Sequence, residues 1–458
     1  MPGKRRGAHK VAPELDHAVT GAPQDTAAGG GIAGGPAAGA PGGAAGGTVT
    51  LYPLTFVAEG DDVIIGRPEI DSFAVFPADG AEVVRRLAAG EDPAAAAAWY
   101  EQTYGEPADI GDFLDTLAEL EFIRPPGVPL PGPLPPVRWR RLAAVLLSWP
   151  ALTVYAAATV AAVALMIAVP ALRPVPSQLF FSRSLLLVFA VGATAQLAGL
   201  LLHEGAHVLA GRRLGLRSRL RVGRRLYFVV AETTLVGLMG VPSRKRILPF
   251  CAGLIADAVV ISVATGVAEA GRLAGWSPIA VRITVVVAWV TLIRMIWQFM
   301  LFMETDLCHV LAAALRCPDL HAMSRSYLGQ QARRLRDRAW PARAPAAGAQ
   351  DGDDDGWTDR DRRVVRRFAP FVLAGSVVII GAAAATTIPA VTGIAERIYH
   401  GVATGQASGE QFWDSLAVGS VITANFIVIG IMLARSRRQR RAALAAAALV
   451  AAAASAAP

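Results

Sequence analysis

The stretch LLLHEGAHVLAGRRLG, residues 200–215, places two histidines and a glutamate within a run of leucines. His203 and His207 are four residues apart, so on a helix they lie on one face, one turn apart. Two neutral imidazoles at this spacing bind one zinc ion, and a carboxylate at the position of Glu204 can act as general base toward water that the metal activates. The motif therefore predicts a hydrolytic site with Zn²⁺ as cofactor, His203 and His207 as metal ligands and Glu204 as catalytic base.

The alternative is that this short pattern arose by chance, as it does in soluble helices. An ionisable residue inside a membrane segment costs about 2.5–3.5 kcal/mol on insertion scales, so such residues rarely persist there without a role. The motif is preceded by LLL and followed by VLA. Because both flanks are apolar, we favour metal binding.

A catalytic zinc ion usually has three protein ligands and one water. The run VTLIRMIWQFMLFMETDLCHVL, residues 290–311, ends among acidic residues. On a continuous helix, residues four apart lie along one face, which here carries Arg294, Gln298, Phe302 and Asp306. We predict Asp306 as the third metal ligand, with Glu304 and His309 as competitors. The alternative role for Asp306 is that of a capping carboxylate where a span meets the membrane surface.

The composition of the chain is typical of a membrane protein. It has 458 residues, 53% of them hydrophobic, and a mean hydropathy of +0.42, which is rare for a soluble protein. A bilayer core about 30 Å thick needs about 20 helical residues. Six runs approach or exceed that length: 142–169, 184–209, 247–268, 279–303, 368–391 and 413–434.

Basic residues predict how these six spans are oriented. The segments rich in arginine and lysine are 138–141, 212–225, 244–246, 325–343 with 360–367, and 435–441. They alternate with connections that are nearly free of basic residues: 170–182, 269–280 and 392–412. By the positive-inside rule, both termini of this multi-pass protein of the cell membrane are cytoplasmic. His203 and Asp306 then both lie near cytoplasmic ends of spans, and the apolar segment 225–241 is interpreted as a hairpin dipping into the membrane.

Two further charges fall deep inside the predicted spans. Asp257 lies about 13 Å from the cytoplasmic end of the third span, and Arg294 lies about 18 Å above Asp306, at about 1.5 Å per helical residue. We expect Asp257 and Arg294 to pair or to share a water-filled cavity. Asp257 could instead line the zinc cavity.

The sequence divides into a soluble N-terminal part and a membrane part. Residues 1–48 are rich in Gly, Ala and Pro and predict a disordered tail. Residues 49–124 predict three short strands followed by helices at 79–89, 93–104 and 109–122. The remaining segments are a Pro-rich linker at 125–138, a membrane core with spans one to four at 139–320, a charged cytoplasmic linker at 321–367, spans five and six at 368–434, and a basic, Ala-rich tail at 435–458. The predicted fold class is mainly α, a polytopic six-helix transmembrane bundle with a small α+β winged-helix-like domain.

The membrane part resembles the site-2 protease family of intramembrane zinc metalloproteases over roughly residues 184–320. His203, Glu204 and His207 match its H-E-x-x-H motif, and Asp306 matches its aspartate ligand. Gln298 takes the place of the family's asparagine eight positions earlier, Phe302 that of a proline and Leu307 that of a glycine. AGLIAD at 252–257 stands where the family has A-G-P-x-A-N. The stretch around Asp306 is most similar to a bacterial subgroup of peptide zinc metalloproteases found with modified-peptide gene clusters.

The segment 49–124 resembles the PqqD-like peptide-binding domain, on its strand and helix pattern and on YPLTFVAEGDDVIIG. The resemblance implies that the domain captures the leader of a ribosomally made precursor peptide, which adds as a strand to a sheet edge. The residues implied at that edge are Ser72, Phe73, Ala74, Val75 and Phe76. The alternative is a winged-helix domain that binds DNA. Its few basic residues argue against a nucleic-acid partner.

These features together predict a zinc-dependent membrane endopeptidase that cleaves a peptide, with Gln298, Asp257 and Arg294 around its cavity. The alternative is a zinc-binding membrane protein without peptidase activity that serves peptide export or immunity. Histidine-box membrane oxygenases are excluded, because they need many clustered histidines and this chain has seven in all. The expected partners are a peptide substrate and the lipid bilayer.

Overall fold

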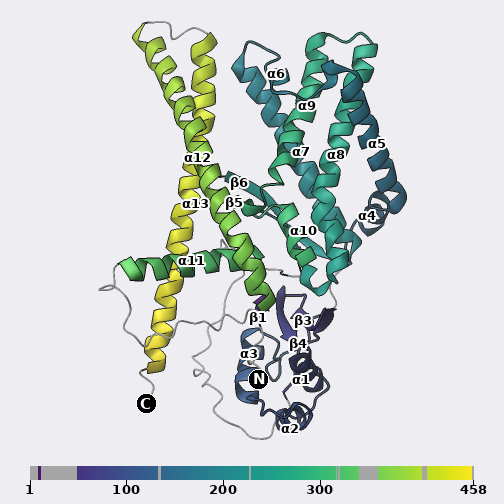
Figure 1. Ribbon diagram of the computed structural model, residues 1–458, viewed down its shortest axis with the longest axis vertical. Coiled ribbons are helices and arrows are strands. Elements are labelled where there is room, and N and C mark those ends of the chain that lie inside the picture. The colour runs from purple at the N-terminus through teal and green to yellow at the C-terminus, as the bar shows by residue number, and fades with distance from the viewer. Residues whose placement is uncertain are drawn as a thin grey trace, which may run out of the picture.

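The computed structural model describes residues 9–11, 49–132, 136–225, 228–315, 317, 320–339, 359–404 and 410–455. They form a small α+β domain and a larger helical part, and the small domain lies at one end of the long axis in Figure 1.

The small domain is a β-meander followed by three helices. Its elements are β2 (Thr55–Glu59), β3 (Asp62–Arg67), β4 (Ser72–Pro77), α1 (Ala78–Ala88), α2 (Pro93–Tyr104) and α3 (Ile110–Glu119). The three strands and three helices expected from the sequence are therefore confirmed. A further strand, β1 (His9–Val11), pairs antiparallel with β4, so that the strand order is β1-β4-β3-β2. The prediction of a wholly disordered tail is wrong for residues 9–11, and the rest of that tail lies outside the described residues.

The sheet of this domain is buried on both faces. On one face Ile65 and Phe76 pack against the three helices. On the other face Ile64 and Phe73 pack with Met239, which belongs to the membrane part. Burial on both faces explains why Val63, Ile64 and Ile65 of β3 are consecutive apolar residues rather than alternating with polar ones.

Within the described residues, six helices are long and apolar enough to cross a membrane, as predicted, so the chain is a multi-pass membrane protein. Four of them are α5 (Trp149–Ala168), α7 (Leu185–Arg213), α8 (Ser243–Leu273) and α9 (Pro278–Trp297). The other two candidate spans, Arg360–Ala382 and Phe412–Gln439, lie within α12 (Asp359–Ala403) and α13 (Glu410–Ser455). In Figure 1, α12 and α13 form a pair beside the other four helices.

Several boundaries differ from the sequence expectation. The first run divides into α4 (Arg140–Leu146) and α5, whose first turn is capped by Ser148. The expected linker 321–367 contains the helix α11 (Leu320–Ala339) and the start of α12, and residues 340–358 lie outside the described part. The expected tail continues α13 to Ser455. Both segments are rich in Ala, Leu, Gln and Arg, which are strong helix formers.

The starts of α7 and α13 lie side by side. The carboxylate of Asp414, near the start of α13, accepts hydrogen bonds from the backbone N–H of Leu185 at 2.7 Å and of Leu186 at 3.3 Å. This carboxylate satisfies backbone donors that the first turn of a helix leaves free. The two helices therefore enter the bundle from the same end. The short elements η1 (Pro170–Leu172) and α6 (Pro176–Leu179) precede α7.

A hairpin follows α7, and the turn after it contacts the small domain. It consists of β5 (Arg217–Arg225) and β6 (Phe228–Val236), followed by the turn η2 (Leu238–Gly240). The expected hairpin at 225–241 therefore exists but begins earlier. Arg246, at the start of α8, is 3% exposed and donates to Glu59 of the small domain at 3.2 Å and to the backbone oxygen of Met239 at 2.8 Å. This buried contact ties the small domain to the membrane part.

Candidate metal centre

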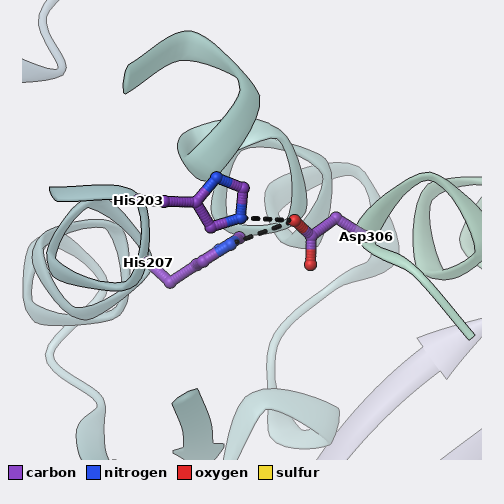
Figure 2. Close-up of side chains that lie close together, drawn as sticks. All are labelled: His203, His207 and Asp306. Carbon is purple, nitrogen blue, oxygen red and sulfur yellow. Dashed lines mark hydrogen bonds and ion pairs between the residues drawn. The ribbon is translucent and has the colours of Figure 1, made fainter. Parts of the chain in front are cut away.

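Three predicted ligands meet at one point, two of them from α7 and one from α10 (Asp306–Leu315). Figure 2 shows the imidazoles of His203 and His207 reaching from α7 toward the carboxylate of Asp306 on the opposite side. Oδ2 of Asp306 lies 3.0 Å from Nε2 of His203 and 3.2 Å from Nε2 of His207. The three potential ligand atoms all lie within 4.8 Å of one another. The cluster can therefore hold a metal ion.

Each imidazole has a hydrogen-bond acceptor at its Nδ1, while its Nε2 faces Asp306. Nδ1 of His203 lies 3.0 Å from Oδ2 of Asp257, and Nδ1 of His207 lies 2.8 Å from the backbone oxygen of Pro249. Both acceptors require a proton on Nδ1, so each Nε2 presents its lone pair to the common centre when a metal is bound.

A glycine of α8 makes room for this arrangement. A Cβ added at Gly253 would collide with the ring of His203 and would lie 2.6 Å from Nε2 of His207. Only a residue without a side chain lets α8 approach α7 this closely. Gly253 is the second residue of the AGLIAD stretch, and the pattern of that stretch predicted no role for this glycine. Its signal in the sequence is its place four residues before the intramembrane Asp257.

Asp306 reaches the site in a different way from the one predicted. α9 ends at Trp297, the turn η3 (Leu301–Met303) follows, and Asp306 is the first residue of α10 (Asp306–Leu315). The predicted continuous face from Arg294 to Asp306 is therefore wrong. The break is held by Gln298, whose Oε1 accepts from the backbone N–H of Asp306 at 3.1 Å and whose backbone oxygen accepts from Thr305 Oγ1 at 2.7 Å.

The two competing ligands lie elsewhere. The ring of His309 stacks on Phe250 at a centroid distance of 5.4 Å. Oε2 of Glu304 lies 3.6 Å from Nδ1 of His321. Asp306 is thus the acidic residue that the described structure groups with the two imidazoles.

Burial of the ligands shows from which side the centre is reached. The side chain of Asp306 is 23% exposed, against 4% for His203 and 10% for His207. Burial alone would raise the pKa of the Asp306 carboxyl, but hydrogen bonds with both imidazoles outweigh it and hold this pKa well below its usual range. Asp306 is therefore the anionic ligand on the accessible side of the centre.

Glu204 and the deeper charges also belong to this region. Glu204 is 8% exposed, and its backbone oxygen accepts from Thr233 Oγ1 of β6 at 3.4 Å. Asp257 and Arg294 form the expected ion pair, with Nη2 at 2.6 Å from Oδ1. The expected pair is therefore confirmed, and Asp257 also contacts Nδ1 of His203. Its lining of a zinc cavity stays a prediction.

The predicted peptide-binding residues form β4. Ser72 donates from Oγ to the backbone oxygen of Leu120 at 2.9 Å. Phe73, Ala74 and Phe76 are buried inside the domain. Val75 pairs with His9 on one side of the strand and with Ile64 on the other. The edge of β4 is therefore covered by β1 rather than open.

Fold and site together define a multi-pass membrane protein with a His-His-Asp cluster, backed by a buried ion pair, that can hold a metal ion. No protein-family model matches this chain, and no curated protein or solved structure matches it either.

Proposed function

We propose that the protein is a zinc-dependent membrane endopeptidase of the site-2 protease type that cleaves a peptide. The observation that carries this proposal is the convergence of His203, His207 and Asp306 within 4.8 Å, from segments about a hundred residues apart in sequence. Their side chains come from two separate helices, α7 and α10.

The donor set supports zinc as the metal. In a tetrahedral zinc shell with bonds of about 2.0–2.1 Å, neighbouring ligand atoms lie about 3.3 Å apart. Oδ2 of Asp306 lies 3.0 and 3.2 Å from the Nε2 atoms of His203 and His207, so these two separations need only a small expansion to fit zinc. Two histidines and one carboxylate also bind iron in some oxygenases. Glu204 beside His203 favours zinc hydrolysis, because that chemistry needs a general base at this place in the motif.

The residues of the chain then have separate tasks. His203, His207 and Asp306 would hold the ion, and Glu204 would take the proton from the attacking water. Zinc bound there would polarise the scissile carbonyl and would lower the pKa of the attacking water to about 7. A peptide enters from the side of Asp306, the most exposed ligand. Burial of the imidazoles strengthens these electrostatic interactions, because the surroundings have a low dielectric constant.

We further propose that the substrate is a ribosomally made, modified precursor peptide recruited by the small domain. The domain packs on Met239 and Arg246. These two residues follow the β5–β6 hairpin in the chain, and Thr233 of that hairpin contacts the backbone of Glu204. A leader that adds to β4 has to replace residues 9–11, because β1 already pairs with that strand. We propose that both termini are cytoplasmic. The end of α7 and the start of α8 are rich in basic residues, which favours the cytoplasmic side, and Arg246 at the start of α8 contacts the small N-terminal domain. Six spans, an even number, then place the C-terminus on the same side as the N-terminus.

Glu204→Gln tests the catalytic part of the proposal. The purified full chain is incubated with a library of fluorescence-quenched peptides, and its zinc content is measured in parallel. We expect the wild-type chain to cleave members of the library. The Glu204→Gln chain should retain its zinc and lose cleavage by at least about 100-fold, since it lacks the base.

Glu269→Gln, the same change on a half-buried α8 carboxylate paired with Arg272, is the matched control and should cleave normally. Equal cleavage by wild-type and Glu204→Gln chains contradicts the proposal. A chain that binds zinc and cleaves nothing in the library supports the non-proteolytic alternative instead.

A further inference from the structure

A buried ionic network lies behind His203, on the side away from the metal centre. Asp257 is 0% exposed, and its Oδ2 lies 3.0 Å from Nδ1 of His203. Arg294 donates to Oδ1 of the same carboxylate, from Nη2 at 2.6 Å and from Nε at 3.2 Å. One carboxylate therefore joins an imidazole of α7 to a guanidinium of α9.

The helix α7 is shaped to accept this guanidinium. A Cβ at Gly199 would lie 2.5 Å from Nη1 and 2.6 Å from Nη2 of Arg294, so the glycine provides its space. One turn earlier, Oε1 of Gln196 accepts from Nη1 of Arg294 at 3.2 Å. The space and the polar contact fix where the guanidinium lies, and with it the orientation of the Asp257 carboxylate.

The two imidazoles are supported unequally. A charged carboxylate accepts from Nδ1 of His203, whereas a neutral backbone carbonyl, that of Pro249, accepts from Nδ1 of His207. A carboxylate acceptor orients a metal-binding imidazole and raises its basicity. The network thus acts on one ligand of the centre and not on the other.

Stability alone does not account for this pair. A buried ion pair is often no more stabilising than apolar residues of similar volume, and charges inside membrane helices are costly. Its position directly behind a ligand gives it a role that apolar residues could not fill.

We propose that Asp257 is a positioning residue that fixes the ring and the tautomer of His203 for metal binding. Arg294, held by Gln196 in the space left by Gly199, is the counter-charge that keeps Asp257 in place. This inference rests on the proposed zinc site. Its consequence is that zinc affinity depends on a network that does not touch the metal.

The test measures zinc affinity of the purified full chain by competition with a chromophoric chelator. The double variant Asp257→Leu with Arg294→Leu removes both charges and leaves neither one alone, so it is expected to fold. Its zinc affinity should fall about 10- to 100-fold. Ser262→Ala is the matched control: it removes a polar contact between α8 and Thr159 of α5 at 3.3 Å and should leave zinc affinity unchanged.

A second double variant, Asp257→Asn with Arg294→Gln, keeps a neutral acceptor for Nδ1 of His203. Its affinity should lie between those of the wild-type chain and the leucine variant. If the leucine variant does not fold, as judged by circular dichroism and gel filtration, the Asn/Gln variant decides. An affinity at least about threefold below that of the wild-type chain then supports the inference, and wild-type affinity overturns it.

Two results separate this inference from the proposed function. A folded leucine variant with wild-type zinc affinity shows that the ion pair is only structural, and overturns the positioning role alone. If His203→Ala binds zinc as tightly as the wild-type chain, the zinc site itself is wrong and both proposals fail.

Discussion

The candidate metal centre in the membrane part is built from side chains, whereas the β4 edge of the small domain is built from backbone groups. At the candidate metal centre, each of the three predicted ligands is held by one specific group: the carboxylate of Asp257, the backbone oxygen of Pro249 or the side-chain amide of Gln298. At the β4 edge, the backbone of residues 9–11 pairs with the backbone of residues 73–75.

This difference sets how each region responds to substitution. A site made of side chains in a buried, closely packed place fails when one atom is added or removed. An edge made of backbone hydrogen bonds tolerates most side-chain changes and fails when the backbone cannot pair. Single side-chain substitutions should therefore cause a large loss of zinc binding at the candidate metal centre and only a small loss of strand pairing at the β4 edge.

Gly253→Ala should have the largest effect. The added Cβ would occupy the space of the ligand nitrogens of both histidines. We expect zinc affinity to fall by at least about 100-fold, the upper end of what loss of a supporting contact causes. Gly266→Ala, on the same helix, adds a Cβ that would have no neighbouring atom within 4 Å, and it should bind zinc normally. Normal zinc binding by Gly253→Ala would contradict the packing at this site.

Deleting residues 1–16 should open the β4 edge. A fluorescent peptide with the sequence of residues 4–16, KRRGAHKVAPELD, is then titrated against the deleted and the intact chains. We expect binding to the deleted chain to be at least about tenfold tighter, because a tethered strand competes at a high effective concentration. Fluorescence anisotropy measures the difference.

Two altered peptides sharpen this experiment. A peptide with His9→Ala and Lys10→Ala keeps its backbone and should bind like the original. A peptide with His9→Pro and Lys10→Pro loses two adjacent backbone N–H groups, one of which faces β4 because neighbouring residues of a strand direct these groups to opposite sides, and it should bind poorly. Equal binding of the proline peptide would mean that the peptide does not add as a strand.

Gln298→Leu should have a smaller effect on the metal centre. It removes the acceptor for the backbone N–H of Asp306 but leaves the carboxylate itself in place. Zinc affinity should fall about tenfold, measured with the same chelator. Gln178→Leu, which removes an exposed amide that donates to Ala171, is the control and should change nothing. A larger loss than that of Gly253→Ala would reverse the expected order of the two effects.

The sequence predicted most of what depends on regular patterns. Apolar runs of about 20 residues identified the six candidate spans, and the i, i+4 spacing put His203 and His207 on one face. Counting residues along two spans was enough to pair Asp257 with Arg294, because helices have a constant rise.

Irregular and long-range features were not predictable in the same way. The helix break between Trp297 and Asp306 contains neither glycine nor proline, and its only local signal was Thr305 before Asp306, a pair typical of helix starts. Depth arithmetic could not show that Asp257 also contacts His203, since rotation about the helix axis decides that contact. The pairing of residues 9–11 with β4 joins segments about sixty residues apart, and the composition around residues 9–11 gave no sign of it.

The most direct test of the central claim is the zinc content of the purified chain with Asp306 or its near neighbour altered. Asp306→Asn and Glu304→Gln make the same carboxylate-to-amide change two residues apart. After dialysis against a weak chelator, the account predicts about one zinc ion per chain for the wild-type and Glu304→Gln proteins and less than about one tenth of that for Asp306→Asn. Full zinc content in Asp306→Asn, or an equal loss in Glu304→Gln, would contradict it.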